Sequence, residues 1–568
     1  MNIDNVLENM GEFGRYQKTR FYLLCVPAAF LCSYAAFLQI FILATPSHRC
    51  VVGPGDVPLV PNHTQPQHYL SIAIPHEWVY GSYGPSQCEM YHHSGSADFS
   101  SPDSWNTSYH PEIKEWNRTN CQNGWDYDRS DWDENIVTKF DLVCDRSWIV
   151  NMLFTMTNVG GITGLLLFSY LEDRWGRRPT FFFSVGWYVV TGVGYCLVDS
   201  WTTLAVLMFL KSFAGAACFQ IPWVIAIELI GPKHHSIMLV VMCVAFAAAC
   251  VLLAGLAYIC RTWIQLTLVV TVPAVLLFIY WPFLDESVRW LIATGRIDQA
   301  KKLLKKIAKT NNAVFDESVI DGLLTKDKEE HLLSDKDSKS YGMWTIFSSC
   351  NLAAKALIIT FIWGTNLIVY YGLTLNIENL GGNQYLVFAL TSLIEIPAAL
   401  FVVVTNRFGR IGPMGISLVV AGISGIVTAA VPQDATWLVI MFATICKLCI
   451  TISFDLIYLV SGVAFPTVIR ASGMGFASML SSIMNVPTPF IIYASIHARM
   501  LPMLVFGFLG IIAGLLSFLL PETMGEPLPD TLEAGEKYKI NMTTFWKNLT
   551  FDYARNRHKR KASKNSYY

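Results

Sequence analysis

The chain has 568 residues, of which 53% are hydrophobic and only 15% are charged, and its mean hydropathy is +0.40. Soluble domains average about 25% charged residues, and a soluble chain of this length would divide into roughly four domains, whose surfaces so few charges do not cover. The formal net charge of -1 lacks the basic excess of nucleic-acid-binding proteins. The composition therefore excludes soluble, disordered and nucleic-acid-binding proteins and favours a membrane protein.

Twelve segments have the length and apolarity of a membrane-spanning helix, which needs about 20 mostly apolar residues. In chain order these predicted spans are 21–47, 148–170, 179–198, 202–230, 237–260, 262–284, 356–377, 383–405, 411–433, 435–460, 471–498 and 500–520. Charged residues occur in three of them, as Lys211 with Glu228, as Glu395, and as Lys447 with Asp455. The first apolar run is too long for that of a signal peptide, so we expect a retained helix.

Lysine and arginine in the short connections predict the orientation, because they concentrate on the cytosolic side. They occur before the first span and after the second, eighth and tenth, at Arg15, Lys18, Arg20, Arg174, Arg177, Arg178, Arg407, Arg410 and Arg470. The opposite connections near 199–201, 372–382 and 431–436 have none. Both termini are therefore predicted to be cytosolic. The expected organisation is 1–20 inside, helix 1 at 21–47, 48–147 outside, helices 2–6 in 148–284, 285–349 inside, helices 7–12 in 350–520, and the cytosolic tail 521–568.

The segment 48–147 has the composition of an extracellular loop. It contains an even number of cysteines, suited to two disulfides, and three N-x-S/T glycosylation sequons: Cys50, Cys88, Cys121 and Cys144, and Asn62, Asn106 and Asn117. Its 14 acidic residues outnumber its 6 basic ones, so it carries -8 against +7 for the remainder of the chain. The near-zero total hides an acidic exterior, which weakly favours cations at the entrance.

Short motifs recur at corresponding places in the two six-span halves. The turn Asp173 to Arg178 after the second span matches 406–410 after the eighth, and Asp285-Glu286 after the sixth span matches Pro521-Glu522 after the twelfth. This repetition predicts two duplicated bundles related by an axis along the membrane normal. Glycine in the D-R-x-G-R pattern allows a tight turn, after which the arginines reach carboxylates and helix ends on the cytosolic face. Between the halves, 297–309 is predicted to be an amphipathic helix, either lying on anionic lipid or simply solvated.

The ordered motifs resemble the major facilitator superfamily and, within it, the organic cation, carnitine and organic anion transporters of animals. The most specific match is the run from Cys121 to Cys144, which includes CQNGWDYD and IVTKFDLVC; further matches are 173–178, 228–233, 286–291 and 465–470. The resemblance implies an all-α polytopic membrane protein with twelve transmembrane helices in two pseudo-symmetric six-helix bundles. It also implies a plasma-membrane carrier for small organic ions that works by alternating access.

Charged residues inside spans are costly and usually functional, which singles out Asp455 and Glu395. Lys447 lies eight residues before Asp455, about 12 Å along a helix and too far for an ideal contact. Asp455 is thus a candidate ligand for an amine or a proton, the alternative being a structural pair with a cation on another helix. Lys211 and Lys447 fit as structural counter-ions. We hypothesise that Asp455 and Glu395 bind the amine of a cationic or zwitterionic substrate.

Besides carboxylates, a cation site commonly contains aromatic residues, because a ring face attracts a cation by about 0.5–2 kcal/mol. Trp363 and Tyr370 are seven residues apart and share a helix face. Both match pocket-lining aromatics in the family that the motifs resemble, as do Phe219 and Phe246. Packing against lipid or a neighbouring helix is the alternative for each ring.

The chain departs from that family at positions that select substrate charge. Ser482 stands where the resemblance implies Asp in cation carriers and Arg in anion and carnitine carriers, and Asn366 stands where cation carriers tend to have Asp. Asp455 stands where an uncharged glutamine is expected. The negative charge of the site is therefore hypothesised to have moved from the eleventh helix to the tenth.

A second departure affects the cytosolic gate, whose predicted residues are Asp173, Arg174, Arg177, Arg178, Glu228, Arg289, Arg407, Arg410, Arg470 and Glu522. Asn406 replaces the expected Asp, and Val463 replaces a Glu. Both losses fall in the C-terminal half, so we expect the gate to depend on the N-terminal set.

No phosphate-binding G-x-x-x-x-G-K-[ST] loop is present, so ATP-driven pumping is not expected. The sequence predicts neither cofactor nor metal and no enzymatic activity. A monovalent cation gains about 2.3 kcal/mol per 100 mV on entering a cell, which suffices for uptake without coupling, and coupling to sodium or protons stays open. The alternatives are an organic anion transporter of the same family and a non-transporting membrane receptor or scaffold.

Overall fold

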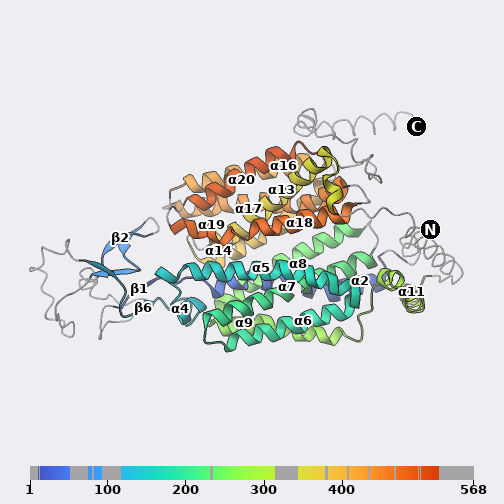
Figure 1. The fold of residues 1–568 in the computed structure, drawn as a ribbon, viewed down its shortest axis with the longest axis horizontal. Helices are drawn as coiled ribbons and strands as arrows, with labels where there is room; N and C mark the ends of the chain where they lie inside the picture. The colour runs from blue at the N-terminus through green and yellow to red at the C-terminus, as the bar shows by residue number, and fades with distance from the viewer. Residues whose placement is uncertain are drawn as a thin grey trace, which may run out of the picture.

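The computed structural model describes residues 11, 13–51, 74–79, 82–91, 117–230, 234–313, 343–377, 382–405, 409–432, 435–465, 469–496, 498 and 500–522. Within this part of the chain, eleven helices are long and apolar enough to cross a membrane, and the 17-residue helix Leu501–Ser517 is a shorter apolar one. Twelve spans thus fit the fold that the sequence predicts. Figure 1 shows them as two layers of roughly parallel helices, one from each half of the chain.

The N-terminal bundle contains α2 (Arg15–Ile42), α5 (Trp148–Trp175), α6 (Arg177–Gly194) with η5 (Tyr195–Leu197), α7 (Trp201–Leu229), α8 (His235–Ile259), and α9 (Trp263–Thr271) with η7 (Val272–Tyr280). The C-terminal bundle contains η8 (Met343–Phe347), α13 (Cys350–Leu375), α14 (Gln384–Leu393) with α15 (Glu395–Thr405), α16 (Ile411–Ala430), α17 (Thr436–Ala464), α18 (Arg470–Asn485) with α19 (Thr488–Tyr493) and η12 (Ala494–Ile496), and α20 (Leu501–Ser517). Helix α2 begins before the apolar run, because Tyr16 and Gln17 are buried and continue the helix.

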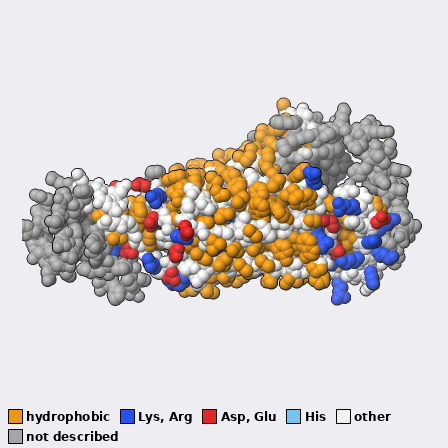
Figure 2. Space-filling model, turned by 60° about the horizontal axis from the view of Figure 1, so that its bottom comes forward, with side chains coloured by type: hydrophobic (Ala, Val, Ile, Leu, Met, Phe, Trp, Pro, Cys, Tyr) orange, Lys and Arg blue, Asp and Glu red, His pale blue; other side chains and the backbone are white. Residues whose placement is uncertain are grey.

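Small residues let paired helices approach closely within each bundle, as is common where lipid removes the hydrophobic driving force. A side chain at Gly160 of α5 would collide with the backbone carbonyl of Phe209 on α7. In the C-terminal bundle, Gly422 of α16 lies directly against Gly507 of α20. Figure 2 shows the outcome on one face of the molecule: hydrophobic side chains cover the middle of the bundles, and charged side chains gather at the two ends.

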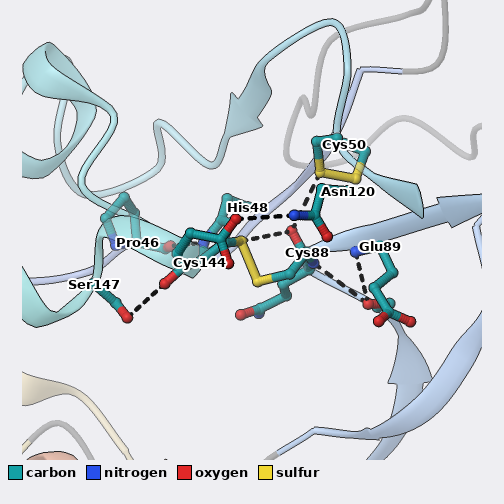
Figure 3. The surroundings of a disulfide bond; sticks show 12 residues. Pro46, His48, Cys50, Cys88, Glu89, Asn120, Cys144 and Ser147 are labelled. Atoms are coloured by element: carbon teal, nitrogen blue, oxygen red, sulfur yellow. Dashed lines mark hydrogen bonds between the residues drawn. A yellow bond between two sulfur atoms is a disulfide. The ribbon is translucent and has the colours of Figure 1, made fainter. Parts of the chain in front are cut away.

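The described residues of 48–147 form a small domain at one end of the bundles, hereafter the disulfide domain. Its strands pair antiparallel as β1 (His48–Cys50) with β6 (Trp125–Tyr127), β2 (His76–Val79) with β3 (Ser82–Pro85), and β4 (Glu89–Tyr91) with β5 (Arg118–Asn120), followed by α4 (Ile136–Phe140) and η4 (Cys144–Arg146). Disulfides join Cys50 to Cys121 and Cys88 to Cys144 (Figure 3). The sequence left this pairing open, since four cysteines allow three connectivities.

Contacts fix the disulfide domain to the N-terminal bundle. The Arg261 guanidinium donates to Asp133 Oδ1 at 2.9 Å, and the Lys139 ammonium donates to the carbonyl of Val198 at 3.0 Å. His48 is buried beside the Cys88–Cys144 disulfide, and burial lowers the pKa of its imidazole below the ordinary value. The ring is therefore neutral near pH 7 and adds no positive charge to this acidic domain.

The opposite end of the bundles carries the arginine-rich turns and is hereafter the basic face. Here α10 (Val288–Ala293) and the predicted amphipathic helix, α11 (Ile297–Asn311), pack on the start of α2. Leu303, Leu304 and Ile307 of α11 are buried against Tyr16 and Leu291. The apolar face of α11 is thus covered by protein, and contact of its lysines with anionic lipid stays a prediction.

Candidate functional site

The eighth predicted span is broken at its middle, and the break positions Glu395. Pro397 has no N–H to offer the carbonyl of Leu393, and α14 ends at that residue. Glu395 then begins α15, where a carboxylate interacts favourably with the helix dipole. The local sequence thus places an acidic side chain at mid-depth and turns it into the C-terminal bundle, where it is 5% exposed.

Three helices contribute to a buried network around Glu395. The Tyr370 hydroxyl of α13 donates to Glu395 Oε1 at 2.6 Å, and the Lys447 ammonium of α17 lies 3.8 Å from the same oxygen. The ammonium is also 3.3 Å from the centre of the Tyr370 ring and donates to the Thr374 hydroxyl. The structure thus places Lys447 as the counter-ion that the sequence suggested.

This network changes the interpretation of Glu395. We expected Glu395 and Asp455 to bind a substrate amine together, yet the Glu395 carboxylate already has an ammonium and a phenol as partners. The sequence did not reveal this pair, because Glu395 and Lys447 are 52 positions apart and meet only through the packing of α15 on α17. Glu395 is consequently a structural partner in this state of the protein.

Asp455 lies two turns along α17 from Lys447 and has different surroundings. Its side chain is buried, with the residue 8% exposed, and its Oδ1 lies 3.9 Å from the Cys243 sulfur on α8 of the other bundle. Within the described part of the chain, no lysine, arginine or histidine forms an ion pair with Asp455. An acid buried without a cationic partner is costly, so this carboxylate suits a positively charged ligand.

Aromatic rings of α13 pack against two rings of α17 that neighbour Asp455 in the sequence. Trp363 lies 4.3 Å from Tyr458 and 6.1 Å from Phe454, and Phe454 stacks on Tyr370 at 5.8 Å between ring centres. Phe454 and Tyr458 precede and follow Asp455 by one and three residues. The sequence analysis predicted Trp363 and Tyr370 and missed the other two, although the i,i+3 spacing of Tyr458 from Asp455 was a usable signal.

Two polar residues of the predicted site differ in their hydrogen bonding. Asn366 of α13 is fully buried, and neither atom of its amide has a partner within the described residues. Buried amides are rarely left unpaired, so this amide is free to bind a ligand or a water. The Ser482 hydroxyl on α18, in contrast, donates to the carbonyl of Ser478 at 2.8 Å.

The two predicted phenylalanines of the N-terminal bundle have different positions. Phe246 of α8 contacts Phe37 of α2 at 5.9 Å between ring centres, and Phe37 contacts Tyr370 at 6.3 Å, so Phe246 adjoins the site across the bundle interface. Phe219 packs instead with the cluster around Phe21, Cys25 and Met242. The structure does not bring Phe219 into contact with the rings around Asp455.

A cavity of about 650 Å³ lies where the disulfide domain meets both bundles. His48, Glu89, Asn120 and Ser147, which Figure 3 labels around the Cys88–Cys144 disulfide, line it together with Tyr493 at the end of α19. The Tyr493 hydroxyl lies 3.4 Å from the Ser147 hydroxyl, a contact between the bundles. The volume falls in the range of small-molecule sites, so this cavity is a candidate entrance.

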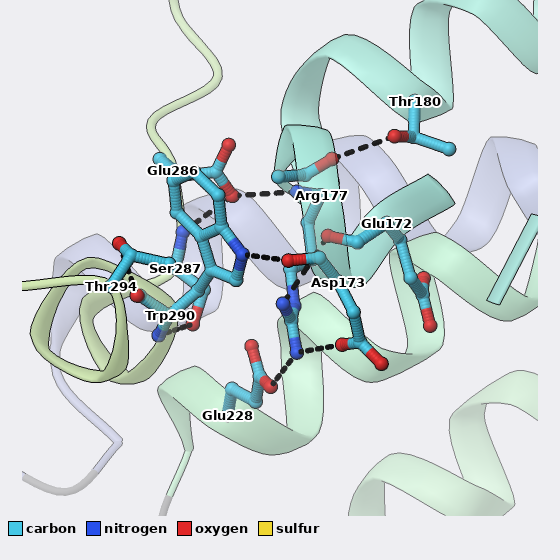
Figure 4. A network of polar contacts seen from close by, with 10 residues as sticks. Glu172, Asp173, Arg177, Thr180, Glu228, Glu286, Ser287, Trp290 and Thr294 are labelled. Atoms are coloured by element: carbon cyan, nitrogen blue, oxygen red, sulfur yellow. Dashed lines mark hydrogen bonds and ion pairs between the residues drawn. The ribbon is translucent and has the colours of Figure 1, made fainter. Parts of the chain in front are cut away.

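The residues predicted to form the gate of the N-terminal bundle make a polar network around Arg177 (Figure 4). Its guanidinium lies 3.1 Å from Glu228 and 3.2 Å from Asp173. The Glu286 carboxylate accepts from the backbone N–H groups of Arg177 and Arg178 at 2.9 and 3.2 Å, at the start of α6. A carboxylate there satisfies unpaired N–H groups and complements the helix dipole.

The C-terminal bundle repeats this carboxylate cap, and within the described residues Arg410 forms no ion pair like those of Arg177. Glu522 accepts from the backbone N–H groups of Arg410 and Ile411 at 3.1 and 3.2 Å, as Glu286 does in the first half. Among the described residues, the Arg410 guanidinium donates to the carbonyl of Leu459 at 3.5 Å, and the charge of the Glu522 carboxylate acts on it without an ion pair. Val463, one turn beyond Leu459, offers it no carboxylate. The expected weakening of this half stays a prediction, because Asn406, Arg407 and the side chain of Arg470 lie outside the described residues.

The remaining predicted gate residues lie near these two centres. Arg178 donates to the carbonyl of Trp281 at 2.7 Å, Arg289 to that of Glu228 at 3.4 Å, and Arg174 to the Tyr170 hydroxyl at 3.1 Å. Arg407 and the side chain of Arg470 lie outside the described residues. The sequons at Asn62 and Asn106 also lie outside them, whereas Asn117 is exposed at the start of β5.

Two six-helix bundles with a repeated gate motif, and with buried charges near an interface between them, define a membrane transporter of the major facilitator type. Residues 104–533 match the family described as sugar (and other) transporter. The fold agrees with the solved inward open conformation of the xylose transporter XylE from E. coli, with a TM-score of 0.53 over 70% of this chain and 93% of that chain at 17% identity.

Relatives cover nearly the whole chain. The organic cation transporter protein of Drosophila melanogaster is 33% identical, covering 95% of each chain. The β-alanine transporter of Drosophila melanogaster is 33% identical over 95% of this chain and 90% of that one. Solute carrier family 22 member 1 of Oryctolagus cuniculus is 31% identical over 94% of this chain and 96% of that one. The chain belongs to the sugar (and other) transporter family, in the group that contains the organic cation transporters and solute carrier family 22.

Proposed function

We propose that this transporter moves small organic cations or zwitterions that carry an amine, by alternating access, and that the Asp455 carboxylate binds the amine. The observation that carries the proposal is the absence of a cationic partner for buried Asp455 among the described residues. Its neighbours Phe454 and Tyr458, with Trp363, supply ring faces that suit an ammonium. The names of the relatives, an organic cation transporter and a β-alanine transporter, share an amine-bearing substrate.

The site favours a cation or zwitterion over an organic anion. An anion needs an available positive charge, and the ammonium of Lys447 is already engaged by Glu395, Thr374 and the Tyr370 ring. Ser482, at the position where anion and carnitine carriers of the resembled family tend to have arginine, provides no charge. A zwitterion remains compatible, because the unpaired amide of Asn366 can donate to a carboxylate.

The cellular setting is part of the proposal. The disulfide domain faces the outside of the plasma membrane, because its disulfides and sequons suit an oxidising compartment. The basic face and both termini are then cytosolic, in line with the charge rule. Transport proceeds without enzymatic chemistry, and the membrane potential alone suffices to drive a cation inward; coupling to sodium or protons would act through Asp455.

The test is uptake of a radiolabelled cation, a zwitterion and an anion by cells expressing Asp455→Asn. Loss of a charge-assisted hydrogen bond, worth about 1.5–3 kcal/mol, is expected to raise the KM for the cation and zwitterion roughly ten- to hundredfold. Asp298→Asn, an exposed acid in the first turn of α11, is the matched control and should transport like the parent. Parent-like cation uptake by Asp455→Asn at equal surface expression would disprove the assignment.

A further inference from the structure

The two buried lysines occupy corresponding places in the repeat. Lys211 lies on α7 and Lys447 on α17, the fourth helices of their bundles, and both helices have 29 residues. Each ammonium donates to a threonine hydroxyl, Thr271 for Lys211 and Thr374 for Lys447. Each also lies against tyrosine rings: the Lys211 ammonium is 5.1 Å from the ring centre of Tyr188 and 4.9 Å from that of Tyr195.

The lysines differ in charge compensation. Glu395 balances Lys447 at 3.8 Å. Lys211 is 6% exposed, and no carboxylate in the described part of the chain forms an ion pair with it. Its ammonium donates to the Tyr195 hydroxyl and to Thr271, both at 3.2 Å, and a lysine ammonium has three donors. When Lys211 is charged, one of its N–H groups therefore has no acceptor, and its charge has no counter-ion, among the described residues.

A small cavity adjoins this ammonium. Its volume is about 20 Å³, and Gln39, Thr157 and Ser212 line it together with Lys211. A site of roughly 10–15 Å³ already admits one water-sized particle. The cavity is therefore too small for an organic substrate and large enough for one small ion. A water would accept the remaining N–H and would leave the charge uncompensated, which is unfavourable for a buried ammonium.

We propose that Lys211 binds one small monovalent inorganic anion, of the chloride class, in this cavity. The anion accepts the third N–H of the ammonium and supplies the charge that Glu395 supplies to Lys447. Ser212 also lines the cavity. The site lies within the N-terminal bundle, away from Asp455, so it stands independently of the proposed amine site.

The test measures chloride binding to the purified full-length protein. Thermal unfolding is followed while sodium chloride replaces sodium gluconate at constant ionic strength, because a ligand that binds only the folded state raises the melting temperature. Chloride is expected to raise it by several degrees, and radiolabelled chloride to bind at one ion per chain. Bromide or nitrate should compete for this binding, and gluconate should not.

Three variants decide the assignment. Lys211→Gln is expected to lose both the chloride-dependent shift and the bound radiolabel, and Lys211→Arg to keep them. Lys302→Gln, an exposed lysine on α11, should respond like the parent. Absence of chloride binding in the parent protein, or retention of full binding by Lys211→Gln, would overturn the proposal. Should Lys211→Gln fail to fold, the competition measured on the parent and on Lys211→Arg still decides whether a selective anion site exists.

Discussion

Gly176 and Gly409 show how single residues fix the turns that carry the gate. Their φ angles are 103° and 100°, a region that side chains rarely adopt. A Cβ at Gly409 would lie 2.6 Å from Glu522 Oε2, and one at Gly176 would collide with Glu286. Glycine is thus required twice at each turn, by the backbone conformation and by the carboxylate that caps the following helix.

Gly176→Ala is therefore expected to destabilise the protein by about 1–3 kcal/mol, the cost of a non-glycine residue in such a conformation. The measurement is thermal unfolding of the purified protein in detergent. Gly255→Ala is the control, because a Cβ at Gly255 meets no atom within 4 Å and its φ is ordinary. Equal melting temperatures for the two variants would contradict the role given to Gly176.

Single residues of the candidate site also show what could and could not be predicted from the sequence. That Asp455 does not pair with Lys447 could be predicted, because the two lie on the same helix at a known separation, whereas a pair with a cation on another helix stayed open. The pairing of Glu395 with Lys447 could not, because it depends on which faces of α15 and α17 meet. Asp455, Trp363 and Tyr370 are thus predictions from the sequence, whereas the engagement of Glu395 and the proximity of Cys243 needed the structure.

At the scale of elements, the sequence predicted the repeat but not the contacts that its residues make. The matching turns predicted two related bundles, yet only the structure shows that Glu286 and Glu522 each cap the helix after the turn. It also shows that the ion pairs of Arg177 lie within the N-terminal bundle. These pairs join α5, α6 and α7 on the basic face.

The asymmetry between Arg177 and Arg410 yields a prediction with two arms. Glu228→Lys places a second cation beside Arg177 and is expected to reduce uptake at least tenfold, because it replaces attraction by repulsion in a half-buried site.

Val463→Glu gives Arg410 the carboxylate that its half lacks and is expected to raise the melting temperature. Val463→Gln, of similar size and uncharged, controls for the second arm. Unchanged turnover in Glu228→Lys would refute dependence of the gate on the N-terminal set.

At the scale of the molecule, apolar runs and basic loops suffice to predict twelve spans and their order, because length and hydrophobicity alone limit what crosses a bilayer. How the bundles meet is set by side chains that have no sequence signature. Tyr258 of α8 packs on Tyr385 of α14 near the disulfide domain, and Phe37 bridges Phe246 and Tyr370 at mid-depth. Cys243 and Asp455 form a further contact between the bundles, toward the basic face.

That last contact can be tested covalently. Asp455→Cys places a second thiol near Cys243, whose sulfur lies 3.9 Å from Asp455 Oδ1, and a short bis-thiol reagent should then link α8 to α17. A protease site introduced between 314 and 342, in the connection between the bundles, makes the link visible as a full-length band on a gel after cleavage. Asp455→Cys combined with Cys243→Ser should yield two separate halves under the same treatment. Because Cys243 and residue 455 belong to bundles that separate and close during alternating access, the linked protein is also expected to be trapped in one state. Failure of the folded single variant to cross-link would show that the two bundles do not meet at these residues.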